Sequence, residues 1–154
     1  MRKKVSEQGR ALIREFEGLS LTAYPDPGTG GEPWTIGYGH TGPEVRPGLK
    51  ISLAEAVDYL DRDLRSHARN VNALCKGSDT PQGAFDALVS FDFNTGALHR
   101  STLLRRHLAG LHQSAAAEFS RWKYAGGRPM AGLIRRRKRE RAMYAAAYAA
   151  ADVG

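Results

Sequence analysis

Residues 17–41 read E-G-L-S-L-T-A-Y-P-D-P-G-T-G-G-E-P-W-T-I-G-Y-G-H-T, and this stretch decides how the chain folds. A helical pattern ends at Glu17, and a turn rich in Gly and Pro then surrounds a second carboxylate, Asp26. A run that favours a β-strand follows at residues 34–36. A helix end, a turn and a strand in this order predict a small α+β lobe that carries two carboxylates on different elements.

Glu17 is predicted to be the last residue of a helix. Ser6 is a suitable N-cap, Gly18 is a suitable terminating residue, and the apolar residues between them recur at helical spacing: Leu12, Ile13 and Phe16. The negative end of a helix and a packed environment both disfavour a second negative charge. We therefore expect Glu17 to hold its proton near neutral pH, as a general acid must.

Asp26 follows Pro25 in a polar turn, where water and backbone amides favour its ionised form. Nine positions separate it from Glu17, which is enough for a hairpin strand to bring the second carboxylate across from the first. Thr35 begins the next predicted strand and is placed to hold a water beside Asp26. Two carboxylates in such different surroundings predict hydrolysis of a glycosidic bond.

Three motifs resemble one known family. The pattern E-G-x-x-L-x-A-Y-x-D followed by W-T-I-G-Y-G-H-T resembles the catalytic segment of the phage-type lysozymes, glycoside hydrolase family 24. Residues 88–96 resemble the L-V-S-F-x-F-N-x-G helix of that family, and residues 132–141 resemble its G-L-x-R-R-R-x-x-E-R segment. The resemblance extends over roughly residues 6–145.

The resemblance implies a role for each matching residue. Glu17 is the expected proton donor, Asp26 the second catalytic carboxylate and Thr35 the third member of the site. The expected substrate-binding residues are Thr41, Phe93, Asn94 and Arg137. The implied reaction cleaves the β-1,4 bond between N-acetylmuramic acid and N-acetylglucosamine in peptidoglycan. One departure is a longer turn between Asp26 and Thr35, which we interpret as a loop elongation that glycines permit.

The expected fold class is α+β and mainly helical, with two lobes in a single lysozyme-like domain over residues 1–154. The small catalytic lobe is expected at about residues 15–50, and the helical lobe at about 51–154 together with the N-terminal helix. Ser52 and Glu55 form a capping-box pattern before a long helix to about Cys75. Its apolar residues are expected in the core: Val57, Leu60, Leu64, Val71 and Leu74.

Further helices are predicted along the second half of the chain. Thr80 and Pro81 indicate the start of one that runs to about Asn94. Ser101 is expected to cap a helix to about Ala109, and Ser114 another through residue 122. The last helix is expected to begin near residue 129, and it carries arginines around its circumference, of which some must face solvent or a cleft.

The net charge of +7 favours an anionic partner, which includes nucleic acid, a membrane surface and the cell wall. The sequence has no recognised nucleic-acid-binding motif, so we expect peptidoglycan, with contact to an anionic membrane as a side activity, and no nucleic acid. The single cysteine, Cys75, is expected to be buried and excludes an internal disulfide. No cofactor and no metal are expected, and His107 and His112 are interpreted as surface residues.

These observations predict a monomeric endolysin that lyses a bacterial host. The sequence has no signal peptide and no membrane-spanning run, so the protein is expected to wait in the host cytoplasm for a holin-type pore protein and then to act in the periplasm. The resemblance implies inversion, and a retaining reaction with Asp26 as nucleophile stays open. The alternatives are a lytic transglycosylase that gives anhydro-muramyl products and a non-catalytic basic module that acts on membranes.

Overall fold

The computed structural model describes residues 2–153, and the side chains of its last helix as far as residue 150. The chain divides into two compact units. One holds the residues up to Leu12 and from His67 onward, and the other is Ile13–Ser66. Two helices cross the boundary in the chain. Helices dominate and the sheets are small and antiparallel, so the predicted α+β class is confirmed.

The first helix, α1 (Glu7–Glu17), has the predicted bounds. The Ser6 hydroxyl accepts a hydrogen bond from the Gly9 amide at 3.3 Å, which confirms Ser6 as its cap. The backbone amide and hydroxyl of Ser6 also donate to Asp86, a buried residue 80 positions further along the chain. At the other end Gly18 has a φ of +69°, a left-handed conformation that ends the helix directly after Glu17.

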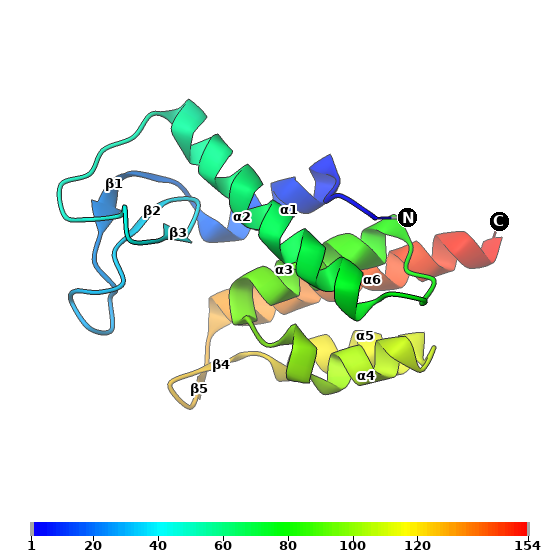
Figure 1. Ribbon diagram of the computed structural model, residues 1–154. Helices are drawn as coiled ribbons and strands as arrows, with labels where there is room; N and C mark the ends of the chain where they lie inside the picture. Colours follow the sequence, from blue (N-terminus) through cyan, green and yellow to red (C-terminus); the bar gives the residue numbers. More distant parts are fainter. Residues whose placement is uncertain (1, 154) are drawn as a thin grey trace. The chain divides into compact units, whose positions relative to one another are not determined.

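The unit Ile13–Ser66 contains a three-stranded antiparallel sheet in the order β1–β2–β3 (Figure 1). Strand β1 is Ser20–Tyr24, β2 is Thr35–Gly37 and β3 is His40–Thr41. The hydrophobic core of this unit lies against the sheet and is formed by five buried residues: Ala23, Ile36, Val45, Ile51 and Ala56. The strand predicted at residues 34–36 is β2, which begins one residue later than predicted, at Thr35.

Helix α2 (Leu53–Leu74) confirms the predicted long helix. Its capping box is reciprocal, because the Glu55 amide donates to the Ser52 hydroxyl at 3.1 Å and the Ser52 amide donates to the Glu55 carboxylate at 3.2 Å. Among the residues predicted in the core, Val57 is 38% exposed, so its assignment was wrong. The buried residues in this part of α2 are Ala56 and Leu60, four positions apart on one face of the helix, and Val57 lies beside that face.

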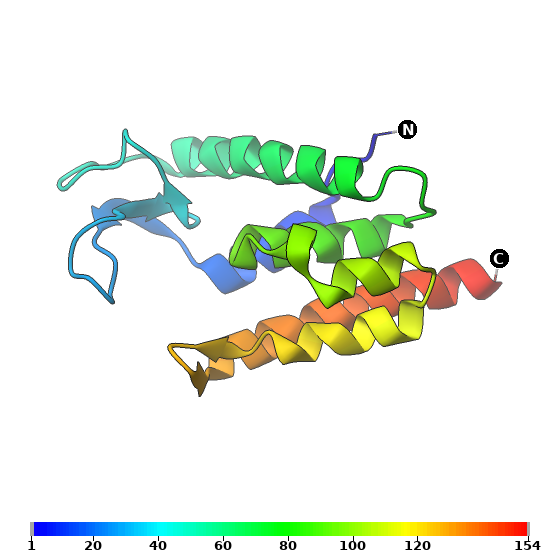
Figure 2. The same cartoon turned by 60° about the horizontal axis from the view of Figure 1, so that its bottom comes forward.

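Helix α3 (Gln82–Thr95) forms the centre of the other unit, and an unbroken run of it from Ala84 to Asp92 is buried. It packs against α6 (Ala131–Val153), which lies beside it in both views (Figures 1 and 2). Pro81 is the N-cap of α3 rather than its first helical residue. The Thr80 hydroxyl does not cap the helix but is hydrogen-bonded to Ser78 and His107. Cys75 is buried as predicted.

Short helices follow α3. A 3₁₀ turn η1 (Leu98–Arg100) precedes α4 (Thr102–Leu108), whose predicted cap is confirmed by a 3.0 Å bond from the Leu104 amide to Ser101. Helix α5 (His112–Glu118) continues into a second 3₁₀ turn, η2 (Phe119–Arg121), and runs beside α4 (Figure 2). The N-cap of α5 is Leu111, so the prediction that Ser114 caps this helix was wrong. Ser114 lies inside α5 and accepts a hydrogen bond from Arg106.

A two-stranded hairpin precedes α6, where the sequence pattern predicts only helices. Strands β4 (Tyr124–Ala125) and β5 (Arg128–Pro129) pair across Gly126 and Gly127, whose φ angles are +58° and +79°. Two consecutive left-handed residues match the twist of a tight hairpin. In residues 2–153 the apolar stretches of the helices are too short or too charged for any of them to cross a bilayer.

Candidate active site

The carboxylate of Glu17 lies against the turn between β2 and β3. A Cβ atom added to Gly39 would stand 2.5 Å from Glu17 Oε1, closer than two such atoms approach in proteins. Partial burial, and then the charge of Glu17, raise the pKa of the Tyr24 hydroxyl, which places Tyr24 of β1 near the same carboxylate. Glu17 is half-buried, so the sheet both holds and partly shields it.

Replacing Gly39 by alanine is expected to displace Glu17 and to lower hydrolysis of peptidoglycan at least about tenfold, since small misplacements of a catalytic group are costly. The φ of +75° adds a strain of about 1–2 kcal/mol to the free energy of folding. Gly48→Ala is the matched control, because its φ is +86° and no atom lies within 4 Å of its added Cβ. Turnover and the urea midpoint are measured for both variants. Equal activity in the two would contradict the steric role of Gly39.

Asp26 sits in a turn whose backbone amides point at its side chain. Its Oδ2 atom accepts hydrogen bonds of 3.0 Å from the amides of Gly28 and Thr29. The backbone closes the turn through two further bonds, from the Gly30 amide to the Asp26 carbonyl at 2.7 Å and from the Asp26 amide to the Gly31 carbonyl at 2.9 Å. The predicted amide donors to Asp26 are confirmed.

Thr35 is the first residue of β2, the central strand. It pairs with Tyr24 of β1 on one side and with Thr41 of β3 on the other. Asp26 follows Tyr24 by two residues, so the register places Thr35 next to the start of the Asp26 turn. The unit Ile13–Ser66 thus brings together four of the predicted site residues: Glu17, Asp26, Thr35 and Thr41. This set offers two carboxyl groups and two hydroxyl groups.

His40 braces the turn that contacts Glu17, and the sequence reading did not find this role. Its Nε2 atom lies 2.5 Å from Glu44, its Nδ1 atom lies 2.7 Å from Asp63, and its ring stacks on Tyr59 at 4.2 Å. The hydrogen bond to His40 lowers the pKa of the Glu44 carboxyl. In the sequence, the only indication of this contact is the separation of four residues between His40 and Glu44. Across residues 2–153, no three His, Cys, Asp or Glu side chains are grouped as ligands of one metal ion.

The other predicted binding residues lie in the unit that contains the chain from His67 onward. Phe93 is half-buried in the last turn of α3, with its ring 5.3 Å from that of His67, and Asn94 is exposed beside it. Arg137 of α6 is only 1% exposed. Its guanidinium donates to the Asn94 side-chain oxygen and pairs with Glu140 at 2.9 Å. Asn94 and Arg137 are therefore brought together by the packing of α3 on α6.

Comparisons with known proteins point to one family. The sequence profile described as "Phage lysozyme" matches residues 14–140. The endolysin of Bacillus phage PZA is 43% identical over 143 residues, which cover 92% of this chain and 55% of that protein. The endolysin of Acyrthosiphon pisum secondary endosymbiont phage 1 is 38% identical over 149 residues, which cover 93% of this chain and 99% of that protein.

A solved structure shares the architecture. The muramidase domain of SpmX from Asticaccaulis excentricus matches with a TM-score of 0.83 and 38% identity, over 93% of this chain and 98% of that one. This match confirms the predicted fold class. The chain spans about half the length of the two Bacillus phage relatives, 55% and 53%, and nearly the whole length of the SpmX domain.

Proposed function

Because the chain belongs to the phage lysozyme family, we propose that it is a muramidase, which hydrolyses the β-1,4 bond between N-acetylmuramic acid and N-acetylglucosamine in peptidoglycan. One observation carries the proposal. The Glu17 carboxylate is packed against Gly39 in the same compact unit that holds Asp26 and Thr35. Two carboxylates in different surroundings are what glycoside hydrolysis requires.

Glu17 is the proposed general acid. As the bond to the leaving sugar breaks, its proton passes to the glycosidic oxygen while the anomeric carbon becomes oxocarbenium-like. Asp26, whose carboxylate accepts hydrogen bonds from the amides of Gly28 and Thr29, is the proposed base, and Thr35 helps it to orient a water. That water attacks the anomeric carbon from the opposite face and gives inversion. In the retaining alternative Asp26 attacks the carbon itself.

The wider biological role is also a proposal. The relatives named endolysin support lysis of a bacterial host from within, with peptidoglycan as the substrate. A monomer of one lysozyme-like domain would be released to the periplasm by a holin-type pore protein. The net charge of +7 supports attraction to the anionic wall, and contact with an anionic membrane is a secondary consequence of the same charge.

Mass analysis of the sugars released from purified peptidoglycan tests the reaction. We expect products with reducing N-acetylmuramic acid ends, because water is the acceptor. A lytic transglycosylase would release anhydro-muramyl products that are lighter by one water. Proton NMR of the fresh product reports the anomeric configuration, and an α-anomer would support inversion. Anhydro products would exclude the proposed hydrolysis, and release of no sugar would exclude catalysis on this substrate.

A further inference from the structure

His67 of α2 is paired with a buried carboxylate of α3, within the unit that contains the chain from His67 onward. Its Nδ1 atom lies 2.8 Å from Oδ2 of Asp92, whose side chain is only 4% exposed. The Asn70 side-chain nitrogen donates to the same oxygen at 3.1 Å. Burial raises the pKa of Asp92, but the hydrogen bonds from His67 and Asn70 outweigh it and leave that pKa below its ordinary value. Asp92 is therefore a charged acceptor inside this unit.

The contact with Asp92 decides which ring nitrogen of His67 carries hydrogen. An ionised carboxylate can only accept hydrogen bonds, so Nδ1 is the protonated nitrogen of the neutral ring. Nε2 is then an acceptor. Among residues 2–153 Nε2 has no hydrogen-bond partner, and the His67 side chain is 31% exposed, so this nitrogen is open to solvent. A buried charge thus holds one acceptor atom in a fixed orientation at the surface.

Phe93 lies beside this acceptor. Its ring is half-buried in the last turn of α3, 5.3 Å from the imidazole of His67 and inclined to it by 59°. Phe93 directly follows Asp92, so neighbouring residues of one helix supply the aromatic ring and the carboxylate that orients the imidazole. An apolar ring next to a few precisely placed polar atoms is typical of small-molecule binding sites.

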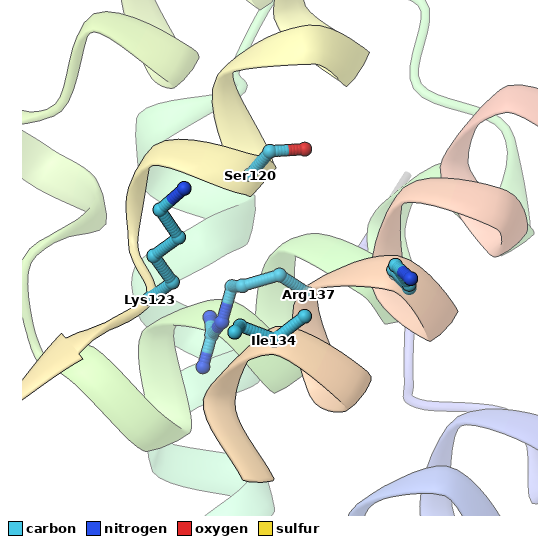
Figure 3. A pocket seen from close by; sticks show the side chains of 5 residues that line it. Ser120, Lys123, Ile134 and Arg137 are labelled. Carbon is cyan, nitrogen blue, oxygen red and sulfur yellow. The ribbon is translucent and has the colours of Figure 1, made fainter. Parts of the chain in front are cut away.

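The next residue, Asn94, supplies a hydrogen-bond donor. The guanidinium of Arg137, which can only donate, is bonded to the side-chain oxygen of Asn94, so the exposed Asn94 keeps its NH₂ group for another acceptor. Arg137 is itself held by Glu140 at 2.9 Å. Figure 3 shows the Arg137 side chain extending from α6 beside Ile134, at a pocket of about 200 Å³. The end of α3 therefore presents an aromatic ring and a donor whose partner is fixed, next to the acceptor on His67.

We propose that His67 is a further substrate-binding residue, which accepts a hydrogen bond at Nε2 from a hydroxyl group of an N-acetylated sugar packed on Phe93, with Asp92 as its positioning residue. The proposal rests on the proposed function, which supplies a chain of such sugars. Each sugar has hydroxyl groups that donate and an acetamido carbonyl that accepts, and these match Nε2 of His67 and the NH₂ group of Asn94. A purely structural link between α2 and α3 would use Nδ1 alone.

Nitrogen-15 NMR of the histidine rings tests the acceptor directly in the wild-type protein. At pH 8 an imidazole is ordinarily neutral, so its protonated and unprotonated nitrogens have distinct chemical shifts. We expect Nδ1 of His67 to be the protonated nitrogen and Nε2 the unprotonated one. The probe is the β-1,4 tetrasaccharide of N-acetylglucosamine, which carries no peptide and no carboxylate. At saturation it is expected to move the Nε2 shift toward the protonated range and to leave Nδ1 unchanged. The opposite tautomer, or an Nε2 shift that does not respond, would overturn the proposal.

The His67→Asn variant separates binding from packing. The asparagine NH₂ group takes the place of Nδ1 and still donates to Asp92, but nothing replaces Nε2. We expect the Kd for the tetrasaccharide to rise about threefold to tenfold, the usual contribution of one hydrogen bond, with native circular dichroism. The matched control is His112→Asn, because His112 is also half-buried and its ring is stacked on that of Tyr148 at 3.7 Å, on α5. Its Kd is expected to stay within about twofold of wild type.

Cellotetraose completes the experiment, because it has the same linkage and ring hydroxyl groups but no acetamido groups. We expect it to bind wild type at least about fivefold more weakly, since the Asn94 NH₂ group loses its acceptor. Equal Kd values for the two sugars would overturn the assignment to N-acetylated sugars, and equal Kd values for His67→Asn and His112→Asn would overturn the role of His67. Neither probe contains N-acetylmuramic acid, so failure of this site is seen here and failure of the hydrolase is seen in the products from peptidoglycan.

Discussion

The Glu17→Gln variant is expected to lose hydrolysis of purified peptidoglycan by about a hundredfold to ten-thousandfold, which is the usual contribution of a general acid. Glutamine keeps the size of the side chain and its place against Gly39, but it cannot give a proton to the departing sugar oxygen. Without that proton the leaving group departs as an alkoxide, which is a far poorer leaving group. Initial rates of reducing-end release measure the loss.

Glu15→Gln is the matched control for this variant. Glu15 is on the same helix, is exposed, and loses the same charge on substitution. We expect its rate to stay within about twofold of wild type and both variants to show the circular dichroism of the native protein. If Glu17→Gln cleaved peptidoglycan as fast as Glu15→Gln, the assignment of the acid would be wrong, and the basic α6 helix would be the leading source of any lysis.

The second large effect is a loss of stability in mild acid that originates at His107. The sequence predicts a surface position for this residue, but it is only 2% exposed. Its Nε2 atom is 2.9 Å from the Thr80 hydroxyl, and its Nδ1 atom is 2.6 Å from the Tyr144 hydroxyl. Burial raises the pKa of Tyr144, so this hydroxyl keeps its proton and can donate it to the neutral ring.

Burial, and then the nearby His112, lower the pKa of His107 from 6.5 to about 4. Below pH 6.5 the unfolded chain binds a proton at this position while the folded chain does not, so the free energy of unfolding falls with the pH. The loss begins near pH 6.5 and is complete once the pH passes about 4. Its size is about 3 kcal/mol, because each pH unit between 6.5 and about 4 contributes about 1.36 kcal/mol.

Urea unfolding between pH 7.5 and 4 measures this loss in wild type and in His107→Gln. Glutamine can pair with both Thr80 and Tyr144 but does not titrate, so the variant is expected to lose about 3 kcal/mol less than wild type over the range. His99→Gln serves as the control, because His99 is exposed. The carboxylates are the same in all three proteins, so their contribution below pH 5 drops out of the difference in unfolding free energy between wild type and each variant. The same pH dependence in wild type and His107→Gln would show that burial of His107 does not govern the acid response.

Several features of the fold followed from local patterns alone. Ser6, Ser52 and Ser101 cap the helices that their positions indicated, and Gly18 ends α1 directly after Glu17. These devices act between residues two to four positions apart, so neighbouring residues are enough to reveal them. The identities of Glu17 and Asp26 as site candidates also came from the sequence, because their motif is contiguous. The bounds of α1, α2 and α3 agree with the helical periodicity to within one or two residues.

Only the tertiary structure decided which side chains are enclosed and what they touch. His107 is buried because Thr80 and Tyr144 lie against it, and they are 27 and 37 positions away. Arg137 is buried with Glu140 beneath α3, although nothing in its basic run separates it from the exposed Arg139. The approach of Glu17 to Gly39 likewise joins a helix end to a distant turn. Local sequence determines backbone hydrogen bonds and periodicity, whereas burial depends on which remote surfaces meet, and the site chemistry of this protein follows from that second property.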